Sequence, residues 1–99
     1  MQYFITGADG VIGTHVVRQL AGREGAVVTV LEGDIRDRTS VHAQLAAARP
    51  DVVIHLAALV PVKEVEADPA AAYAVNVGGT LHLMEGLAGL EKPPRVFYA

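Results

Sequence analysis

Three glycines at regular spacing are the strongest chemical signal in the sequence. Gly7, Gly10 and Gly13 lie between an apolar run and a segment with helical spacing, and residues 6–13 read TGADGVIG. Gly7 permits a tight turn, Gly10 lets the backbone approach a pyrophosphate without a Cβ, and Gly13 lets a helix pack closely on a sheet. The free amides and the positive dipole at the start of a helix attract phosphates.

The glycine turn therefore predicts a dinucleotide site. It lacks the Gly-Lys-[Ser/Thr] ending of a nucleoside-triphosphate P-loop. The alternative is a glycine-rich turn that binds nothing. The predicted contacts along the turn are Gly7, Asp9, Gly10, Val11, Ile12 and Gly13.

One acidic residue bears on the choice between NAD and NADP. Glu32 lies nineteen positions after Gly13, close to the roughly 20-residue spacing at which a carboxylate binds the adenosine ribose. Its charge would repel the 2′-phosphate of NADP, so NAD is the favoured cofactor and NADP the less favoured one. Two alternatives stay open, since a loop carboxylate is often simply solvated and since Arg36 and Arg38 could meet a 2′-phosphate.

The histidines do not predict a metal site. The chain has no cysteine, and His15, His42, His55 and His82 show no paired ligand spacing. His55 falls at the end of an apolar run, which favours a core histidine whose ring nitrogens are hydrogen-bonded.

Alternating strands and helices are expected to position these residues. Strands are predicted over residues 3–6, 26–31, 51–56 and 95–98, and helices over 11–20, 39–49 and 69–87. The alternation, with right-handed crossovers, predicts an α/β fold. We expect a three-layer Rossmann-like parallel sheet of four strands in the order 2-1-3-4, with helices on both faces. Residues 26–31 form a nearly continuous β-branched run, which favours a strand buried on both faces.

Local signals mark where the helices begin. Asp37 and Asp68 are the expected N-caps, and Pro69 suits the first helical position. Gly78 and Gly79 fall inside the third helix, where each costs roughly 1 kcal/mol relative to alanine. They either allow close packing or bend the helix.

Five segments, in order, resemble the extended short-chain dehydrogenase/reductase family, which includes nucleotide-sugar epimerases and dehydratases. Residues 6–13 resemble its TGxxG[FVI]IG signature, 33–37 its GD[IVL]RD element, and 51–58 its DxV[IF]HLAA strand. Residues 76–80 resemble its NVxGT helix motif, and 95–99 the strand that leads to its active-site serine. The resemblance implies the cofactor-binding half of such an enzyme.

The resemblance also implies contacts beyond the glycine turn. By position, Asp34 would accept a hydrogen bond from the adenine amino group and the Ile35 backbone would hold the ring. The residues implied to line the dinucleotide at the end of the third strand are Leu56, Ala57 and Ala58. For Asp34 the alternative is a turn residue that bonds its own backbone.

Two departures from the family pattern matter. The family's catalytic serine or threonine and its Tyr-x-x-x-Lys pair are expected beyond residue 99, and no Tyr-x-x-x-Lys begins at Tyr3, Tyr73 or Tyr98. No catalytic residue is therefore predicted, and Asn76, which matches a residue that supports the active site, is expected to be structural. The chain also lacks a βαβ unit of about 30 residues before Gly33, so that one strand replaces two.

Composition limits the classes of partner. Residues 1–99 suit one dinucleotide-binding domain, and 52% hydrophobic with 19% charged residues is a globular balance. With a net charge of −3 and no basic run, we expect no nucleic-acid partner, and no apolar run reaches the roughly 18 residues of a membrane span. The lack of cysteine and of a signal-peptide pattern favours a cytoplasmic location.

Three functions remain open at this point. The first is an NAD-binding module that does not catalyse alone. The second is part of an NAD-dependent epimerase or oxidoreductase that needs another half, and the third is a structural or self-associating unit that binds no nucleotide. The terminal strand and the apolar helix over residues 70–87 predict a homo-oligomer.

Overall fold

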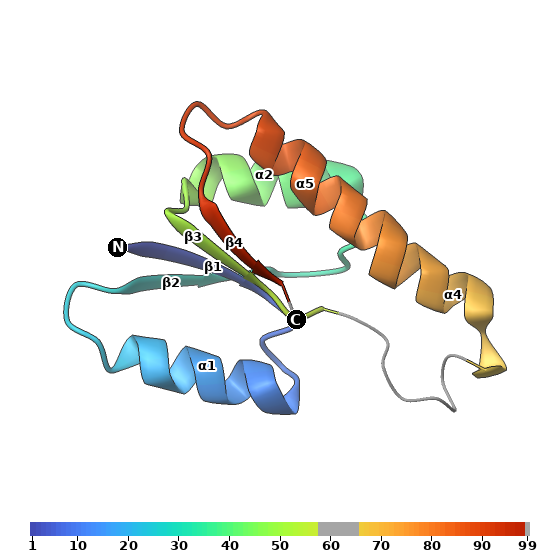
Figure 1. The fold of residues 1–99 in the computed structure, drawn as a ribbon, viewed down its shortest axis with the longest axis horizontal. Coiled ribbons are helices and arrows are strands. Elements are labelled where there is room, and N and C mark those ends of the chain that lie inside the picture. The colour runs from blue at the N-terminus through green and yellow to red at the C-terminus, as the bar shows by residue number, and fades with distance from the viewer. Residues whose placement is uncertain (58–65, 99) are drawn as a thin grey trace.

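The computed structural model describes residues 1–57 and 66–98, and its centre is a four-stranded parallel sheet (Figure 1). The strands are β1 (Gln2–Thr6), β2 (Val27–Val30), β3 (Val52–His55) and β4 (Arg95–Tyr98). Their order across the sheet is β2-β1-β3-β4, and all three pairs are parallel. The predicted order is confirmed, and it places the switch point between β1 and β3.

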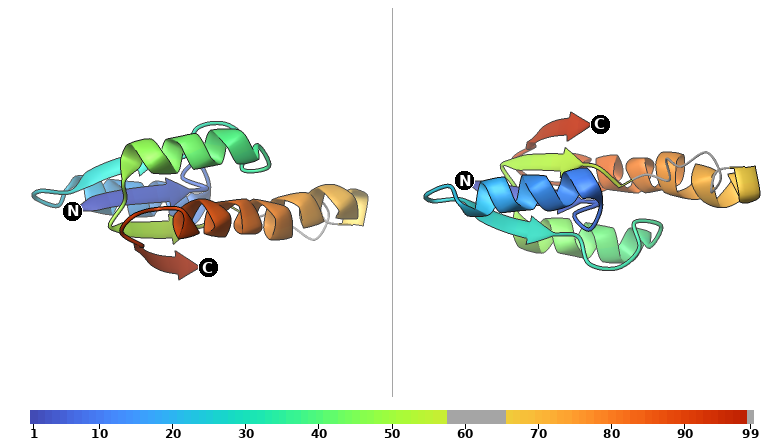
Figure 2. Two further views of the ribbon diagram at one scale, coloured as in Figure 1. Left: turned by 90° about the horizontal axis from the view of Figure 1, so that it is seen from above. Right: turned by 90° about the horizontal axis from the view of Figure 1, so that it is seen from below.

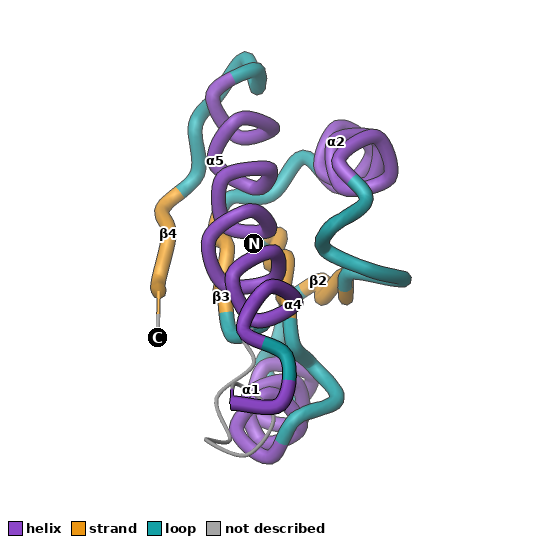
Figure 3. Tube along the Cα trace, turned by 90° about the vertical axis from the view of Figure 1, so that its right-hand side faces the viewer, coloured by secondary structure: helices purple, strands orange, loops and turns teal. Residues whose placement is uncertain are grey.

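Helices cover both faces of the sheet, as the predicted three-layer fold requires. They are α1 (Val11–Ala21), α2 (Arg38–Ala48), α4 (Pro69–Tyr73), the π-helix η1 (Ala74–Gly79) and α5 (Thr80–Ala88). Figures 1 and 3 show α1 on one side of the strands and α2 with α5 on the other.

The two predicted N-caps are present. The Asp37 carboxylate accepts a hydrogen bond from the Ser40 amide at 3.2 Å and begins α2. The Asp68 carboxylate accepts from the Ala71 amide at 3.0 Å, with Pro69 at the start of α4. Each cap satisfies an amide that the helix itself leaves without a partner.

The main core lies between the sheet and the helix pair α2 and α5. Its buried members are Phe4, Ile35, Val41, Leu45, Val53, Leu83 and Leu87. The prediction that residues 26–31 form a strand buried on both faces is wrong, because Val27 is 49% exposed and Val30 is 36% exposed. β2 is the edge strand of this order, and its β-branched residues reflect strand propensity rather than two-sided burial.

The third predicted helix is one continuous rod of three parts. α4, η1 and α5 follow each other without a break, and Figure 2 shows the rod extending past the carboxyl ends of the strands. A Cβ at Gly79 would lie 2.6 Å from Cγ2 of Ile35, whereas one at Gly78 would meet nothing within 4 Å. Gly79 therefore serves close packing. Among the described residues, no helix is long and apolar enough to cross a membrane.

Candidate dinucleotide site

The glycine turn joins the end of β1 to the start of α1. Gly7 has a φ of +73°, and its carbonyl accepts the Gly10 amide at 3.2 Å. The first helical hydrogen bond runs from the Thr14 amide to the Gly10 carbonyl at 2.9 Å. The amides of residues 11–13 precede that bond, and Gly10 has no side chain to cap them. They form the cradle expected for an anion.

The three glycines play different structural roles. A Cβ at Gly13 would lie 2.1 Å from the Gly7 carbonyl oxygen, so Gly13 packs α1 onto the turn itself rather than onto a strand. A Cβ at Gly7 would lie 2.6 Å from the Leu56 carbonyl carbon. A Cβ at Gly10 would come no closer than 3.5 Å, to the Gly7 oxygen, which is an ordinary contact. The fold requires Gly7 and Gly13, but it does not require Gly10.

A cleft of about 660 Å³ opens beside the turn at the carboxyl edge of the sheet. Three strand ends and the long helix contribute to it. Its lining residues are Gly7, Ala8, Asp9, Gly10, Val30, Leu31, Gly33, Asp34, Ile35, Leu56, Ala57 and Val75. Its position at the switch point is the usual place for a ligand in an open α/β sheet.

The structure brings most of the predicted site residues together. Those that line the cleft are Gly7, Asp9, Gly10, Asp34, Ile35, Leu56 and Ala57. Val11, Ile12 and Gly13 lie outside the lining, in the first turn of α1, and Ala58 lies outside the described residues. The binding role of every one of these residues stays a prediction.

Glu32 does not line the cleft, although its spacing from Gly13 suggested a ribose contact. Its amide donates to Oε1 of Gln44 at 2.9 Å, and its carbonyl accepts from Nε2 of Gln44 at 2.8 Å. This pair of bonds ties the residue just beyond β2 to helix α2. Glu32 itself is exposed.

Asp34 lines the cleft and is bound to its neighbour Arg36. Its carboxylate accepts the Arg36 amide at 2.9 Å and also pairs with the Arg36 guanidinium, at 2.9 Å from Nε to Oδ2. These hydrogen bonds lower the pKa of Asp34 to about 2, so the carboxylate is ionised at neutral pH. The turn contact is the alternative that the sequence left open for Asp34, and it leaves the side chain at the cleft.

Sequence reasoning missed the apolar walls of the cleft. Val30 and Leu31 lie at the end of β2, and Val75 lies in the π-helix. Apolar side chains carry no chemical signature in the sequence, so only the packed structure reveals them. Gly33, with a φ of +82°, turns the chain into the Asp34 loop.

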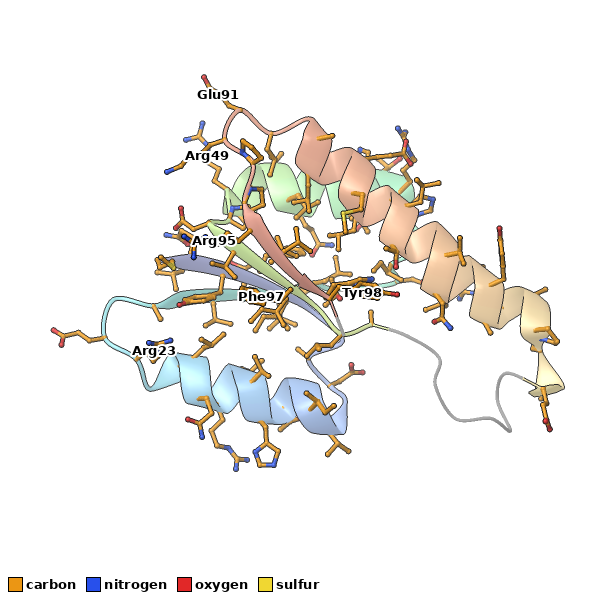
Figure 4. All side chains as sticks on the ribbon, viewed as in Figure 1. Arg23, Arg49, Glu91, Arg95, Phe97 and Tyr98 are labelled. Carbon is orange, nitrogen blue, oxygen red and sulfur yellow. The ribbon has the colours of Figure 1, made fainter. Side chains whose placement is uncertain are left out.

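His55 is a hydrogen-bonded core histidine, as predicted. Its side chain is 1% exposed. Nδ1 lies 2.6 Å from the Thr6 hydroxyl and Nε2 lies 2.8 Å from the Thr80 hydroxyl. Burial lowers the pKa of the imidazole below its ordinary 6.5. The Tyr98 ring, labelled in Figure 4, lies 5.4 Å from the His55 ring between centroids.

Residues 1–91 match the RmlD substrate binding domain family. The chain belongs to this family. A dTDP-4-dehydrorhamnose reductase of Streptomyces griseus is 40% identical over 87 residues, which cover 85% of this chain and 28% of the relative. A UDP-glucose 4-epimerase of Rhizobium meliloti is 38% identical over 96 residues, covering 81% of this chain and 29% of the relative. These relatives confirm the predicted kinship with extended short-chain dehydrogenases/reductases.

The chain spans less than a third of the length of these relatives. The alignment with the reductase is 87 residues long and covers 85% of this chain, so it places few gaps in this chain. With the epimerase, a longer alignment covers a smaller share, so the epimerase carries additional residues.

Solved structures agree with the fold. The Thermus thermophilus UDP-glucose 4-epimerase complex with NAD has a TM-score of 0.80 at 32% identity, over 87% of this chain and 33% of that one. The dTDP-4-dehydrorhamnose reductase of Bacillus anthracis in complex with NADP has a TM-score of 0.79 at 26% identity, over 87% and 32%. Relatives of this chain are thus Rossmann-type proteins that bind a nicotinamide dinucleotide.

Proposed function

We propose that this chain binds a nicotinamide dinucleotide in the cleft, with the pyrophosphate on the amides at the start of α1. The observation that carries the proposal is Gly10. Among the described residues its missing Cβ has no structural cause, since the nearest atom would be 3.5 Å away. A side chain there would instead add atoms between the amides at the start of α1 and the cleft that Gly10 lines, where we expect the pyrophosphate to bind.

NAD rather than NADP is the proposed cofactor, with Asp34 as the deciding residue. Asp34 lines the cleft and is ionised, because Arg36 holds its pKa at about 2. A carboxylate at the adenosine end accepts from the ribose 2′-hydroxyl and repels a 2′-phosphate. Arg36 is already paired with this carboxylate, which reduces its attraction for a 2′-phosphate.

The test of binding is a fluorescence titration of NADH with Gly10→Ala and a matched control. Gly22 caps the other end of α1, and a Cβ there would lie 3.7 Å from its nearest neighbour. Both substitutions fit the fold, but only Gly10→Ala projects at the cradle. We expect Gly10→Ala to weaken NADH binding at least tenfold, while Gly22→Ala binds like the parent chain. A flat response of the parent chain up to millimolar NADH would contradict the proposal and favour a structural or self-associating unit that binds no nucleotide.

The cofactor choice has a separate test. Asp34→Asn removes the repelling charge and releases Arg36 from its ion pair. We expect the ratio of NADPH affinity to NADH affinity to rise at least tenfold in this variant. An unchanged ratio would show that Asp34 does not select the cofactor.

The activity of the whole protein is a further part of the proposal. The sequence holds no Tyr-x-x-x-Lys, so we assign the cofactor site to this chain and the proton-transferring groups to another half. The match of residues 1–91 to the RmlD family and the 40% identity to a reductase favour hydride transfer to a keto group of a nucleotide-linked sugar over epimerisation. NADH oxidation with such a sugar, after a relative's carboxyl-terminal half is joined to this chain, would test it.

A further inference from the structure

Three side chains form a buried hydrogen-bonded chain beneath the cleft. Thr6 ends β1, His55 ends β3 and Thr80 begins α5. Thr6 is 0% exposed and His55 is 1% exposed, so neither side chain can touch a ligand in the cleft. The two contacts of the imidazole, at 2.6 Å and 2.8 Å, link two strands of the sheet to the long helix.

The partners of the two hydroxyls fix the direction of each hydrogen bond. The Thr6 oxygen accepts the amides of Leu56 and Ala57, both at 3.1 Å, so its own proton points to Nδ1 of His55. The Thr80 hydroxyl donates to the Asn76 carbonyl at 2.7 Å, so it accepts from Nε2. The imidazole is therefore neutral, with its proton on Nε2.

The series of hydrogen bonds from Thr6 through His55 ends at Thr80, in the irregular turn of the long helix. In an α-helix the Thr80 amide would donate to the Asn76 carbonyl. Here that amide donates to the Val77 carbonyl, and the Thr80 hydroxyl satisfies the Asn76 carbonyl instead. His55 thus holds the side chain that stabilises the π-helical turn.

Each end of this hydrogen-bonded series of side chains lies next to a wall of the cleft. Gly7 follows Thr6, the amides of Leu56 and Ala57 bond to Thr6, and Val75 precedes Asn76 in the π-helix. All four of these neighbours, Gly7, Leu56, Ala57 and Val75, line the cleft. The spacing of the glycine turn, the end of β3 and the long helix is therefore set by hydrogen bonds that converge on one ring.

We propose that His55 is a positioning residue, whose neutral ring ties Thr6 to Thr80 and so holds three walls of the cleft at the separation that a dinucleotide requires. The proposal rests on the proposed function. It goes beyond it, because His55 acts without touching the ligand. Loss of either ring contact is expected to weaken binding by the folded protein, in addition to any loss of stability.

The best test is a matched pair at Thr80. Thr80→Ser keeps the hydroxyl, whereas Thr80→Val has nearly the same shape and lacks it. Both variants are titrated with NADH under conditions where circular dichroism shows each to be folded. Thr80→Val should bind NADH at least tenfold more weakly than the parent chain. Thr80→Ser should have a dissociation constant close to that of the parent chain. Equal dissociation constants for the two variants would overturn the proposal.

A second measurement needs neither a variant nor a ligand. Two-dimensional ¹H–¹⁵N spectra of the histidine rings report which nitrogen carries the proton, and we expect His55 to show a protonated Nε2 and an unprotonated Nδ1 at neutral pH. A protonated Nδ1 would refute the hydrogen-bond directions. A parent chain that binds no NADH would contradict the proposed function instead, so the two failures are distinguishable.

Discussion

Gly13→Ala tests whether the turn is held together by a contact that only glycine permits. Gly13 is buried in the first turn of α1. A Cβ there would lie 2.1 Å from the Gly7 carbonyl oxygen, 2.7 Å from Cα of Ala8 and 2.9 Å from the Gly7 carbonyl carbon. All three atoms belong to the backbone, so no side-chain rotation relieves the clash. The oxygen contact must lengthen by roughly 1 Å or more to approach an ordinary non-bonded separation.

The size of the effect follows from two opposing terms. Forcing a methyl group into a tightly packed site costs about 1–3 kcal/mol, and alanine gains roughly 1 kcal/mol over glycine inside a helix. We expect Gly13→Ala to lower the free energy of unfolding by up to about 2 kcal/mol. Gly78→Ala is the matched control, since a Cβ there meets nothing within 4 Å. That variant should be stabilised by about 0.5–1 kcal/mol.

Urea unfolding followed by circular dichroism measures both variants. These two identical substitutions in helical segments should change the free energy of unfolding in opposite directions, which helix propensity alone cannot produce. A Gly13→Ala variant as stable as Gly78→Ala would refute the contact between α1 and the turn. Binding of NADH by Gly13→Ala should also weaken, because the displaced turn carries the amides that we propose to hold the pyrophosphate.

Three further predictions concern a helix cap, pH and association. Asp37→Ala removes the carboxylate that caps α2 through the Ser40 amide, and it should cost about 1 kcal/mol in urea unfolding. Burial lowers the pKa of His55 below 6.5, so the unfolded chain binds a proton that the folded chain rejects. As the pH drops below 6.5, the free energy of unfolding should fall, by at most about 1.4 kcal/mol for each pH unit. The dependence on pH should be shallower in His55→Gln if that variant folds. Exposed apolar side chains recur along the long helix, at Tyr73, Val77, Leu81 and Met84, and we expect a homo-oligomer that Leu81→Glu dissociates; a light-scattering mass of one chain for the parent would contradict this.

Local signals in the sequence were enough to predict the elements and their order. The caps at Asp37 and Asp68 depend on side chains three residues or fewer from the amides they bind, so they are visible in the sequence. Strand–helix alternation with right-handed crossovers limits the sheet to few arrangements, and the order 2-1-3-4 is one of them. The glycine turn is equally local, since Gly7 and Gly13 meet within seven residues.

Features that depend on distant contacts could not be predicted. The close packing of Gly79 depends on Ile35, which is far away in the sequence. The hydrogen bonds of His55 connect Thr6 with Thr80, and a threonine has many uses in a sequence. Spacing from Gly13 singled out Glu32, but it could not show that Glu32 lies outside the cleft lining while Asp34 lies within it.

The glycine turn and the loop that follows β2 are separate parts of the structure. The turn is held by the Gly7 carbonyl against Gly13, by the Gly10 amide, and by the Thr6 hydroxyl on the backbone at the end of β3. These contacts use β1, α1 and β3, and do not involve β2. A sheet that ends at β2 can therefore keep the glycine turn intact, while the loop at residues 33–35 forms another wall of the cleft. β2 lies at the edge of the sheet, where its two end residues are exposed, and this exposure does not reach the glycine turn.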